Sequence, residues 1–355
     1  MGCAASMKKQ GVVDTARNAG LDAVGLAAGG GGAALGAIGH GIAGAALSVA
    51  DVVTLGQIDS IGDAKDEHFE EMNDGMGDAK AGMVCFTANT DYYRSKPPAD
   101  DKTDWMAKIP DEVNVTQLFL PGTHDTVALS GGSLAQCQSW TLAEQLNAGL
   151  RAFDIRAKHE EDALPIYHGI IRMETDFDAA VDDMENFLEQ HPTELILVRI
   201  KREGESGEHH SDFNEAILSK FKHSEYWHTK CPEWKSLGEM RGKIVPVAIG
   251  SAMKLYRHAL DVQDVYDIGD ENKKFDEIKT HAMKDRTPGT LFVSFCSAVG
   301  REGNTCFKAP CVLAYDVNKM VMDAMPGGEF GAGVYLFDFP GNALVDAVIA
   351  RNPTG

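Results

Sequence analysis

Leu118-Phe119-Leu120-Pro121-Gly122-Thr123-His124-Asp125 carries the strongest indication of fold and chemistry in this chain of 355 residues. An apolar run ends at Pro121-Gly122, and a histidine and a carboxylate follow shortly after this turn. A strand that stops at a loop is where barrel enzymes place their reacting groups. A histidine beside an aspartate is common in proteins, so the interpretation depends on further clusters of the same kind.

Two further clusters repeat the arrangement, Phe153-Asp154-Ile155-Arg156 and Ile166-Tyr167-His168-Gly169. Each has ionisable residues at the end of a short run that is typical of a β-strand. Two histidines, two carboxylates and an arginine at successive strand ends are suited to phosphoryl transfer.

Runs typical of strands alternate with runs typical of helices in the second part of the chain. The expected strands are 116–120, 151–156, 195–200, 243–249, 291–295 and 333–337. The expected helices are 141–148, 176–190, 212–222 and 318–325, with Asp176 as the N-cap of the second. Alternation of this kind predicts a parallel α/β fold. Periodicity alone does not separate a closed barrel from an open sheet.

Nine motifs, in this order, make the chain resemble the catalytic X domain of phosphatidylinositol-specific phospholipase C, and most closely its bacterial, metal-independent branch. They lie at 118–126, 137–146, 149–156, 167–169, 192–194, 199–203, 241–245, 262–266 and 334–338. The resemblance covers residues 104–355. It implies an imperfect (β/α)8 barrel of the TIM type, an architecture of about 250 residues.

The resemblance also implies a set of catalytic roles. His124 would be the general base and His168 the general acid. Asp338 would orient the base, Asp125 would accompany the acid, and Arg156 would contact the non-bridging phosphate oxygens. The product implied is diacylglycerol with inositol 1,2-cyclic phosphate, since the inositol 2-hydroxyl is an internal nucleophile.

No metal and no other cofactor is expected. Metal-dependent relatives carry an Asn after the first His and acidic residues where this chain has Arg156 and Lys201, and Asp125 replaces that Asn. Two cations therefore stand in the position of a calcium site, and Asp154 alone cannot form a calcium cage. His209-His210 lies in a polar run and is interpreted as a solvated loop rather than a metal site.

The resemblance assigns inositol contacts to Lys201, Asp264 and Tyr266. A family arginine is missing, because the run 245–249 holds no basic residue. The substrate is therefore left open between phosphatidylinositol, its glycosylated form and a related lipid. Pockets for 4- and 5-phosphates are not indicated, since no cluster of Lys and Arg lies near the site.

Two other functions compete with this one. An X domain of weak activity could serve as a lipid-binding or scaffold module, although the set His124, Asp125, Arg156, His168 and Asp338 is intact. A metal-dependent glycerophosphodiesterase would carry His-Arg-Gly and Pro-Glu-Asn motifs, and neither occurs.

Charge and cysteine content limit the partners and the compartment. A formal charge of −20 and a pI of about 4.9 exclude a basic nucleic-acid footprint and oppose attraction to an anionic bilayer. The 7 cysteines form no CxxC pair, and no secretory signal is recognisable. A reduced, intracellular protein is expected, in which most cysteines act as buried small hydrophobes.

The N-terminus predicts a membrane anchor of another kind. Met1-Gly2-Cys3-Ala4-Ala5-Ser6 matches the myristoylation pattern, and Cys3 suits a second acyl chain, which stable anchoring requires. Peripheral attachment to the cytoplasmic face of a membrane, the plasma membrane first, is therefore predicted. The expected organisation is an acylated N-terminus (1–19), an extension that is first Gly/Ala-rich and then acidic and ends in a linker (20–103), and the catalytic barrel (104–355). The Gly/Ala-rich run 23–50 is interpreted as flexible or shallowly membrane-associated rather than as a membrane span.

Overall fold

The computed structural model describes residues 84–85, 87–98, 102–161, 163–203, 210–222, 224–228, 233–247, 258–301, 303 and 307–355. The predicted acylation sites Gly2 and Cys3, the Gly/Ala-rich run 23–50 and His209 lie outside these residues. His210 was predicted to lie in a solvated loop but is the first residue of a helix. No helix in the part of the chain that the structure describes is long and apolar enough to cross a membrane.

Seven parallel strands of the described residues form a curled sheet in the order β6-β5-β2-β1-β9-β8-β7. In that order they are β6 (Lys243–Pro246), β5 (Leu195–Arg202), β2 (Ala152–Ala157), β1 (Phe119–Thr123), β9 (Gly333–Phe337), β8 (Leu291–Phe295) and β7 (Leu260–Gln263). The described parts of β6 and β7 do not pair, so the barrel stays open there. The predicted imperfect barrel is confirmed.

Strand register brings the three sequence clusters together. Thr123 pairs with both Phe153 of β2 and Phe337 of β9, so the residues that follow these strands lie at one end of the barrel. On the next pair of strands, Arg156 of β2 pairs with Lys201 of β5. The antiparallel hairpin of β3 (Pro165–His168) and β4 (Ile171–Asp176) extends from the edge of β2 and carries His168.

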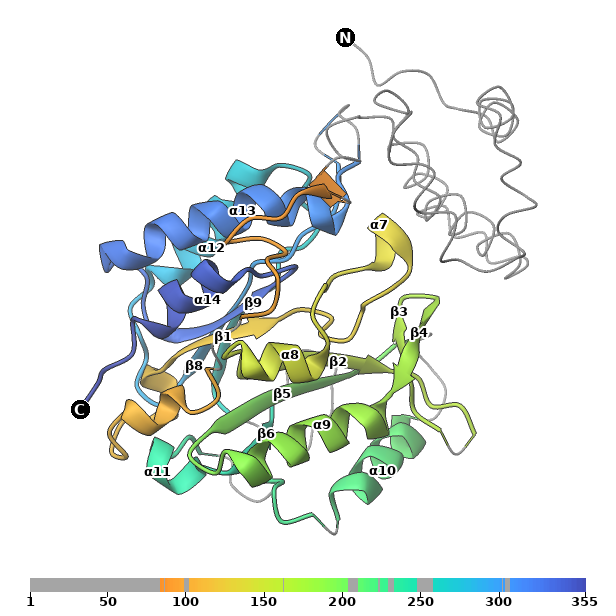
Figure 1. The fold of residues 1–355 in the computed structure, drawn as a ribbon, viewed down its shortest axis with the longest axis vertical. Coiled ribbons are helices and arrows are strands. Elements are labelled where there is room, and N and C mark those ends of the chain that lie inside the picture. The colour runs from red at the N-terminus through yellow and green to blue at the C-terminus, as the bar shows by residue number, and fades with distance from the viewer. Residues whose placement is uncertain are drawn as a thin grey trace.

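Helices cover the outer face of the sheet (Figure 1). On the β5 and β6 side lie α9 (Phe177–Gln190) and α10 (His210–Phe221), and on the β8 and β9 side lie α12 (Glu271–Ala282), α13 (Pro310–Ala324) and α14 (Asn342–Ile349). Shorter helices are α7 (Gly132–Ala135), α8 (Leu142–Asn147) and α11 (Leu237–Met240). The predicted N-cap of α9 is present, since Asp176 accepts a hydrogen bond from the Ala179 backbone N–H.

Two buried layers hold the barrel together. The inner layer fills the interior of the barrel with branched and aromatic side chains, among them Leu120, Leu197 and Leu336. The outer one joins the strands to the helices, as where Phe337 packs with Val317 of α13. Burial of a side chain of this kind contributes about 1.5–3 kcal/mol, so both layers stabilise the strand ends on which the polar clusters lie.

The predicted elements differ from the structure at several points. β1 begins at Phe119, because Asn114 caps a 3-10 turn over Val115–Gln117. The predicted turn at Pro121-Gly122 is wrong, because β1 continues through both residues to Thr123 and pairs there with β9. α13 begins at Pro310, well before the predicted residue 318, and proline is well accommodated in a first helical turn. Strands β4 and β7 and helices α7, α11, α12 and α14 were not predicted.

The segment predicted as a linker lies against the barrel. The Trp140 indole Nε1 donates to the Ser95 carbonyl at 2.7 Å, and the Asn342 side-chain amide donates to the Lys96 carbonyl at 2.9 Å. A disulfide also joins Cys85 to Cys311 of α13. This bond differs from the expectation of reduced cysteines, whereas the other described cysteines, Cys137 and Cys296, are free and buried. Short cysteine motifs such as CxxC could not reveal this disulfide, since 226 residues separate the two cysteines.

Candidate active site

His124, the first residue after β1, is held in one tautomer by two neighbours. Its Nδ1 lies 2.9 Å from a carboxylate oxygen of Asp338, which follows β9. Its Nε2 lies 2.6 Å from Nη2 of Arg156. Because a guanidinium only donates, Nε2 must be the acceptor, so Nδ1 carries the proton and donates to Asp338. Burial, and next the charge of Arg156, hold the pKa of His124 well below its usual value of 6.5. The ring is therefore neutral, with its lone pair facing the guanidinium.

Arg156 lies at the centre of the cluster, on β2. Its Nη1 is 2.9 Å from Asp125 and 3.3 Å from Glu203, and its Nη2 is 2.9 Å from Asp154. These three carboxylates outweigh burial and raise the pKa of Arg156 well above its usual value. The side chain is 11% exposed, so a fixed positive charge reaches the surface of the site.

Asp154 holds Arg156 in place through hydrogen bonds. Its Oδ1 accepts from Arg199 at 3.1 Å, while its Oδ2 accepts from Nε and Nη2 of Arg156. Burial opposes the charged form of Asp154, but the two arginines outweigh it and hold its pKa below the usual range. Asp154 is therefore an ionised support for Arg156 rather than a proton donor.

His168 faces the cluster from the β3–β4 hairpin. Its Nδ1 lies 2.7 Å from the Ala135 carbonyl, which can only accept, so this nitrogen also carries a proton. Its Nε2 points to Oδ2 of Asp125 at 3.5 Å. The rings of His124 and His168 stand edge to face with centroids 6.5 Å apart. A group bound between them could receive a proton from one ring and lose one to the other.

The backbone around His124 is fixed from several sides. Asp125 adopts φ +42°, a left-handed conformation that residues with a side chain seldom adopt and that recurs at functional sites. The Gln138 side-chain amide donates to the carbonyls of His124 and Phe337, and so ties the ends of β1 and β9 together. The buried Thr126 hydroxyl accepts from the Asp154 backbone N–H at 2.8 Å and links β1 to β2.

Within the cluster of hydrogen-bonded side chains, carboxylates outnumber arginine and lysine cations. Four carboxylates, Asp125, Asp154, Glu203 and Asp338, face three fixed or lysine cations, Arg156, Arg199 and Lys201. One negative charge remains when both histidines are neutral. Burial, and next the charge of Asp125, raise the pKa of Asp338, so the site disfavours the charged form of this carboxyl group.

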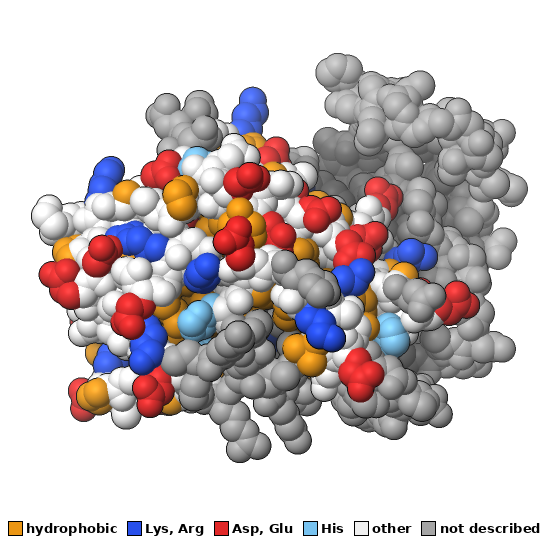
Figure 2. Space-filling view, turned by 90° about the horizontal axis from the view of Figure 1, so that it is seen from below, with side chains coloured by type: hydrophobic (Ala, Val, Ile, Leu, Met, Phe, Trp, Pro, Cys, Tyr) orange, Lys and Arg blue, Asp and Glu red, His pale blue; other side chains and the backbone are white. Residues whose placement is uncertain are grey.

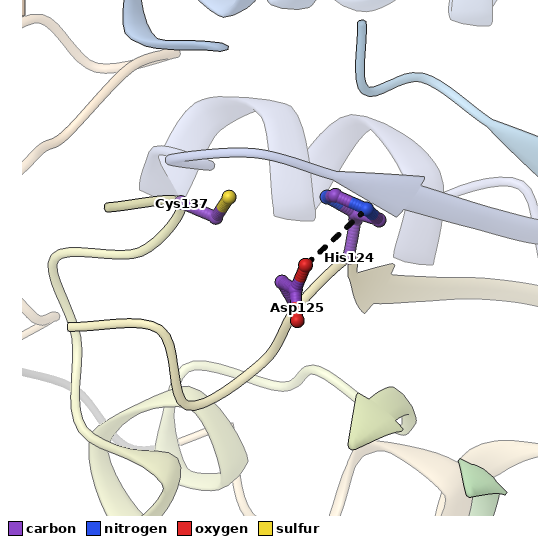
Figure 3. Close-up of side chains that lie close together, drawn as sticks. All are labelled: His124, Asp125 and Cys137. Atoms are coloured by element: carbon purple, nitrogen blue, oxygen red, sulfur yellow. Dashed lines mark ion pairs between the residues drawn. The ribbon is translucent and has the colours of Figure 1, made fainter. Parts of the chain in front are cut away.

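One group in the described residues has the composition of a metal site. Figure 3 shows His124 and Asp125 at the end of β1, with the Cys137 sulfur on a neighbouring loop. Ligand atoms of the three residues lie within 4.8 Å of one another. However, Arg156 already bonds His124 and Asp125. A metal ion would have to displace this guanidinium, so the donor set fits a resident arginine better than a metal.

The predicted site residues fall into two groups. His124, Asp125, Arg156, His168 and Asp338 converge, and Lys201 joins them beside Glu203, with 3.5 Å between Nζ and the carboxylate. Asp264 and Tyr266 follow β7 at the same end of the barrel, but both side chains are exposed, and within the described residues neither contacts the cluster.

Sequence reasoning had not assigned roles to Glu203, Arg199 and Gln138. The first two belong to the motif at 199–203, and their position at the end of β5 was the available indication. Gln138 and the Ala135 carbonyl lie on the loop between β1 and β2, and no pattern reveals their direction.

Comparison with known proteins agrees with this geometry. The family model "Phosphatidylinositol-specific phospholipase C, X domain" matches residues 114–247. The 1-phosphatidylinositol phosphodiesterase of Listeria monocytogenes is 29% identical over 276 residues, which cover 70% of this chain and 84% of the relative. A protein of the same description from Staphylococcus aureus is 25% identical over 177 residues, 46% of this chain and 54% of the relative.

Solved structures support the same relationship. The Listeria monocytogenes phosphatidylinositol-specific phospholipase C superposes with a TM-score of 0.61 at 27% identity, covering 71% of this chain and 99% of that one. A Staphylococcus aureus phosphatidylinositol-specific phospholipase C gives a TM-score of 0.61 at 20% identity, which concerns the fold alone. Motif order, barrel topology and the paired histidines agree with these comparisons: residues 114–247 of this chain match the phosphatidylinositol-specific phospholipase C X-domain family.

Proposed function

We propose that this protein cleaves phosphatidylinositol, or its glycosylated form, to diacylglycerol and inositol 1,2-cyclic phosphate. The observation that carries the proposal is the pair of oriented histidines around Arg156. His124 presents a neutral Nε2 to the guanidinium, and His168 presents its own Nε2 from the other side of Asp125. The similar bacterial proteins bear the name of this activity.

The chemistry follows from these positions. The inositol 2-hydroxyl loses its proton to Nε2 of His124 as its oxygen attacks the adjacent phosphorus. Asp338 stabilises the imidazolium that forms, through the hydrogen bond to Nδ1. Arg156 bonds the phosphoryl oxygens on which negative charge grows. Nε2 of His168 gives its proton to the glycerol oxygen as the ester bond breaks.

We propose that Arg156 also takes the electrostatic role that calcium has in metal-dependent relatives. Three carboxylates surround it, a set that would otherwise suit a hard cation, and the guanidinium bonds all of them. Two parallel donors can grip a phosphate in the same way. Catalysis is then expected to proceed when divalent ions are removed.

One assay tests both statements. The purified protein is incubated with phosphatidylinositol vesicles in excess EGTA, and cyclic inositol phosphate is followed by phosphorus NMR. The expected result is product formation at the same rate with and without chelator. A rate that vanishes with EGTA and returns with calcium contradicts the metal-free mechanism. Complete inactivity in both conditions would favour the weakly active scaffold module instead.

The headgroup preference follows from what lies near Arg156. Lys201 is a second cation near the surface of the site, and burial followed by the charge of Arg156 lowers its pKa. The exposed ring of Tyr266 can stack on a sugar. We propose that these residues receive an inositol without further phosphates. Competition between phosphatidylinositol, a glycosylated form and the 4,5-bisphosphate tests this, and preference for the bisphosphate contradicts it.

Membrane attachment is proposed to depend on acyl chains at Gly2 and Cys3. On the face that Figure 2 shows, the Asp and Glu side chains of the described residues are interspersed with those of Lys and Arg, and these described residues form no broad basic surface for anionic lipid. An acyl chain contributes ~0.8 kcal/mol per buried methylene, and two chains anchor stably. We expect attachment to the cytoplasmic face of the plasma membrane.

Fractionation of cells that contain both acyltransferases tests this anchor. Gly2→Ala is expected to release the protein into the cytosol, and Cys3→Ser to leave weak, reversible attachment. Activity on detergent-dispersed substrate serves as the control and should persist in both. A Gly2→Ala protein that stays in the membrane pellet would make segment 23–50 the better candidate anchor.

A further inference from the structure

The segment 90–96, here called the strap, lies outside the strands and helices of the barrel yet bonds the turn that carries Asp338. Backbone N–H groups of Gly341 and Ala343 donate to the carbonyls of Tyr92 and Asp91 at 3.0 and 2.7 Å. A Cβ atom at Gly341 would lie 2.5 Å from strap backbone atoms. The strap therefore packs on residues 339–343 more closely than a side chain at Gly341 would permit.

The turn itself has a strained backbone that the strap holds. Phe339, directly after Asp338, adopts φ +45°, which is unfavourable for a bulky residue and costs of order 1–3 kcal/mol. The Arg94 backbone N–H donates to the Phe339 carbonyl at 3.0 Å. The buried Tyr93 ring packs on the Phe339 ring with centroids 5.8 Å apart. Such a conformation persists only where its surroundings impose it, and the strap supplies one side of them.

Helix α13 supplies another side. Its fully buried Asn318 donates to the carbonyls of Asp338 and Phe339 at 2.9 and 3.3 Å. The same helix carries Cys311, whose disulfide to Cys85 attaches the residues that precede the strap. The disulfide thus fastens the strap to the helix that grips the same turn.

The loop that orients the second histidine also meets this helix. The Cys311 sulfur lies 3.8 Å from the Ser133 carbonyl of α7. Two residues later, the Ala135 carbonyl accepts from His168. The strap and α13 therefore contact both the turn that carries Asp338, the partner of His124, and the segment that carries the Ala135 carbonyl, the partner of His168.

We propose that the strap, tethered by the Cys85–Cys311 disulfide, positions Asp338 against His124 and so sets the catalytic rate. This role rests on the proposed phosphodiesterase function. The strap touches no reacting atom, and its effect passes through the Asp338–Phe339 turn. Misplacement of a supporting group by about 1 Å can cost roughly 100-fold in rate.

The first test replaces the ring that packs on Phe339. Tyr93→Ala is expected to lower kcat roughly 10- to 100-fold on detergent-dispersed phosphatidylinositol, with KM unchanged. Tyr93→Phe keeps the ring and should restore the rate. Arg241→Gln is the matched control, because Arg241 bonds the carbonyls of Met106 and Ile109 away from Asp338. It should lower the melting temperature without lowering kcat.

The second test opens the tether. A dithiol reductant converts the disulfide to two thiols and is itself oxidised to a cyclic disulfide. Reduction is expected to lower the kcat of the wild type to that of Cys85→Ser, whose own kcat should not respond to the reductant. The unchanged response of Cys85→Ser controls for every other cysteine in the chain.

A spectroscopic readout separates positioning from stability alone. The proton on Nδ1 of His124 should give a downfield NMR resonance, because it is shared with Asp338. Tyr93→Ala should weaken or shift this resonance, and Arg241→Gln should not. If Tyr93→Ala and Cys85→Ser lower only the melting temperature, with kcat and the resonance unchanged, the strap has no positioning role. A further outcome is an inactive wild type that shows the resonance, together with a Tyr93→Ala variant that loses it. That outcome would overturn the enzymatic function but would support the contact between the strap and the Asp338 turn.

Discussion

Two arginines at opposite ends of one strand show how the same side chain serves structure and chemistry. Arg151 precedes β2 and is fully buried, whereas Arg156 lies near its other end at the site. Arg151 donates to Glu194 and to four backbone carbonyls: Leu146, Leu150, Lys102 and Thr103. Arg156 instead faces three carboxylates and a histidine nitrogen.

Electrostatics separates the two in the same way. Burial lowers the pKa of Arg151 and raises that of Glu194, so each charge is held against its cost of desolvation. The pKa of Arg156 is raised, because its carboxylates outweigh burial. The N–H groups of Arg151 bond one carboxylate and backbone carbonyls of the fold, whereas Arg156 faces three carboxylates. A phosphate can exchange with some of those partners, and this distinguishes a binding arginine from a structural one.

The largest loss of rate is expected when either histidine at this end of the barrel is removed. His124→Ala and His168→Ala should each lower kcat roughly 10²–10⁴-fold, because a general base or acid is lost. Circular dichroism should show a folded protein in both cases. A variant that keeps more than about a tenth of the wild-type rate would refute the role of that histidine.

A smaller loss is expected for Arg156→Lys. The lysine keeps the charge but cannot present two parallel donors to phosphate, so kcat should fall roughly 10²–10³-fold. The free energy of unfolding should change little, since the ammonium can still bond the surrounding carboxylates. Steady-state kinetics and urea unfolding measure the two quantities, and near-normal kcat would place phosphate binding elsewhere.

The pH dependence should reflect the low pKa of His124. Because burial and Arg156 disfavour the imidazolium, the acid limb of kcat/KM is expected to have its midpoint below 6.5. The unfolded chain binds this proton more readily, so the His124 contribution to stability is lost as pH falls below 6.5. A pH profile of kcat/KM checks the first statement. A midpoint at or above 6.5 would show that His124 is stabilised in its charged form.

Periodicity predicted a parallel α/β fold, and the family resemblance predicted the barrel and its five site residues, which the structure brings together. This was possible because parallel strands bring their carboxyl ends to one edge, so motifs after Leu120, Ile155 and Phe337 had to meet. The strands β8 and β9 matched their predicted bounds, since each is a short apolar run between turn residues.

Contacts that depend on loop conformation could not be predicted from the sequence. The direction of the Ala135 carbonyl, the packing of the strap and the Cys85–Cys311 bond arise from tertiary structure, not from periodicity. Helix α12 was missed because it contains many charged residues, among them the buried Lys274. Local pattern cannot show that such a charge is buried.

The smallest effect on rate is expected at the other end of β2. Arg151→Met removes a buried partner of Glu194 and leaves that carboxylate without its cation, which should lower the free energy of unfolding by ~3–5 kcal/mol. The folded fraction should keep its kcat, because no contact of Arg151 reaches the catalytic cluster. Activity corrected for the folded fraction, measured with urea unfolding of the same sample, tests this. Arg151→Met combined with Glu194→Leu should recover part of the stability, since the orphaned charge is gone. A large drop in corrected kcat would mean that the two ends of the strand are coupled, and that the division between structural and binding arginines does not hold.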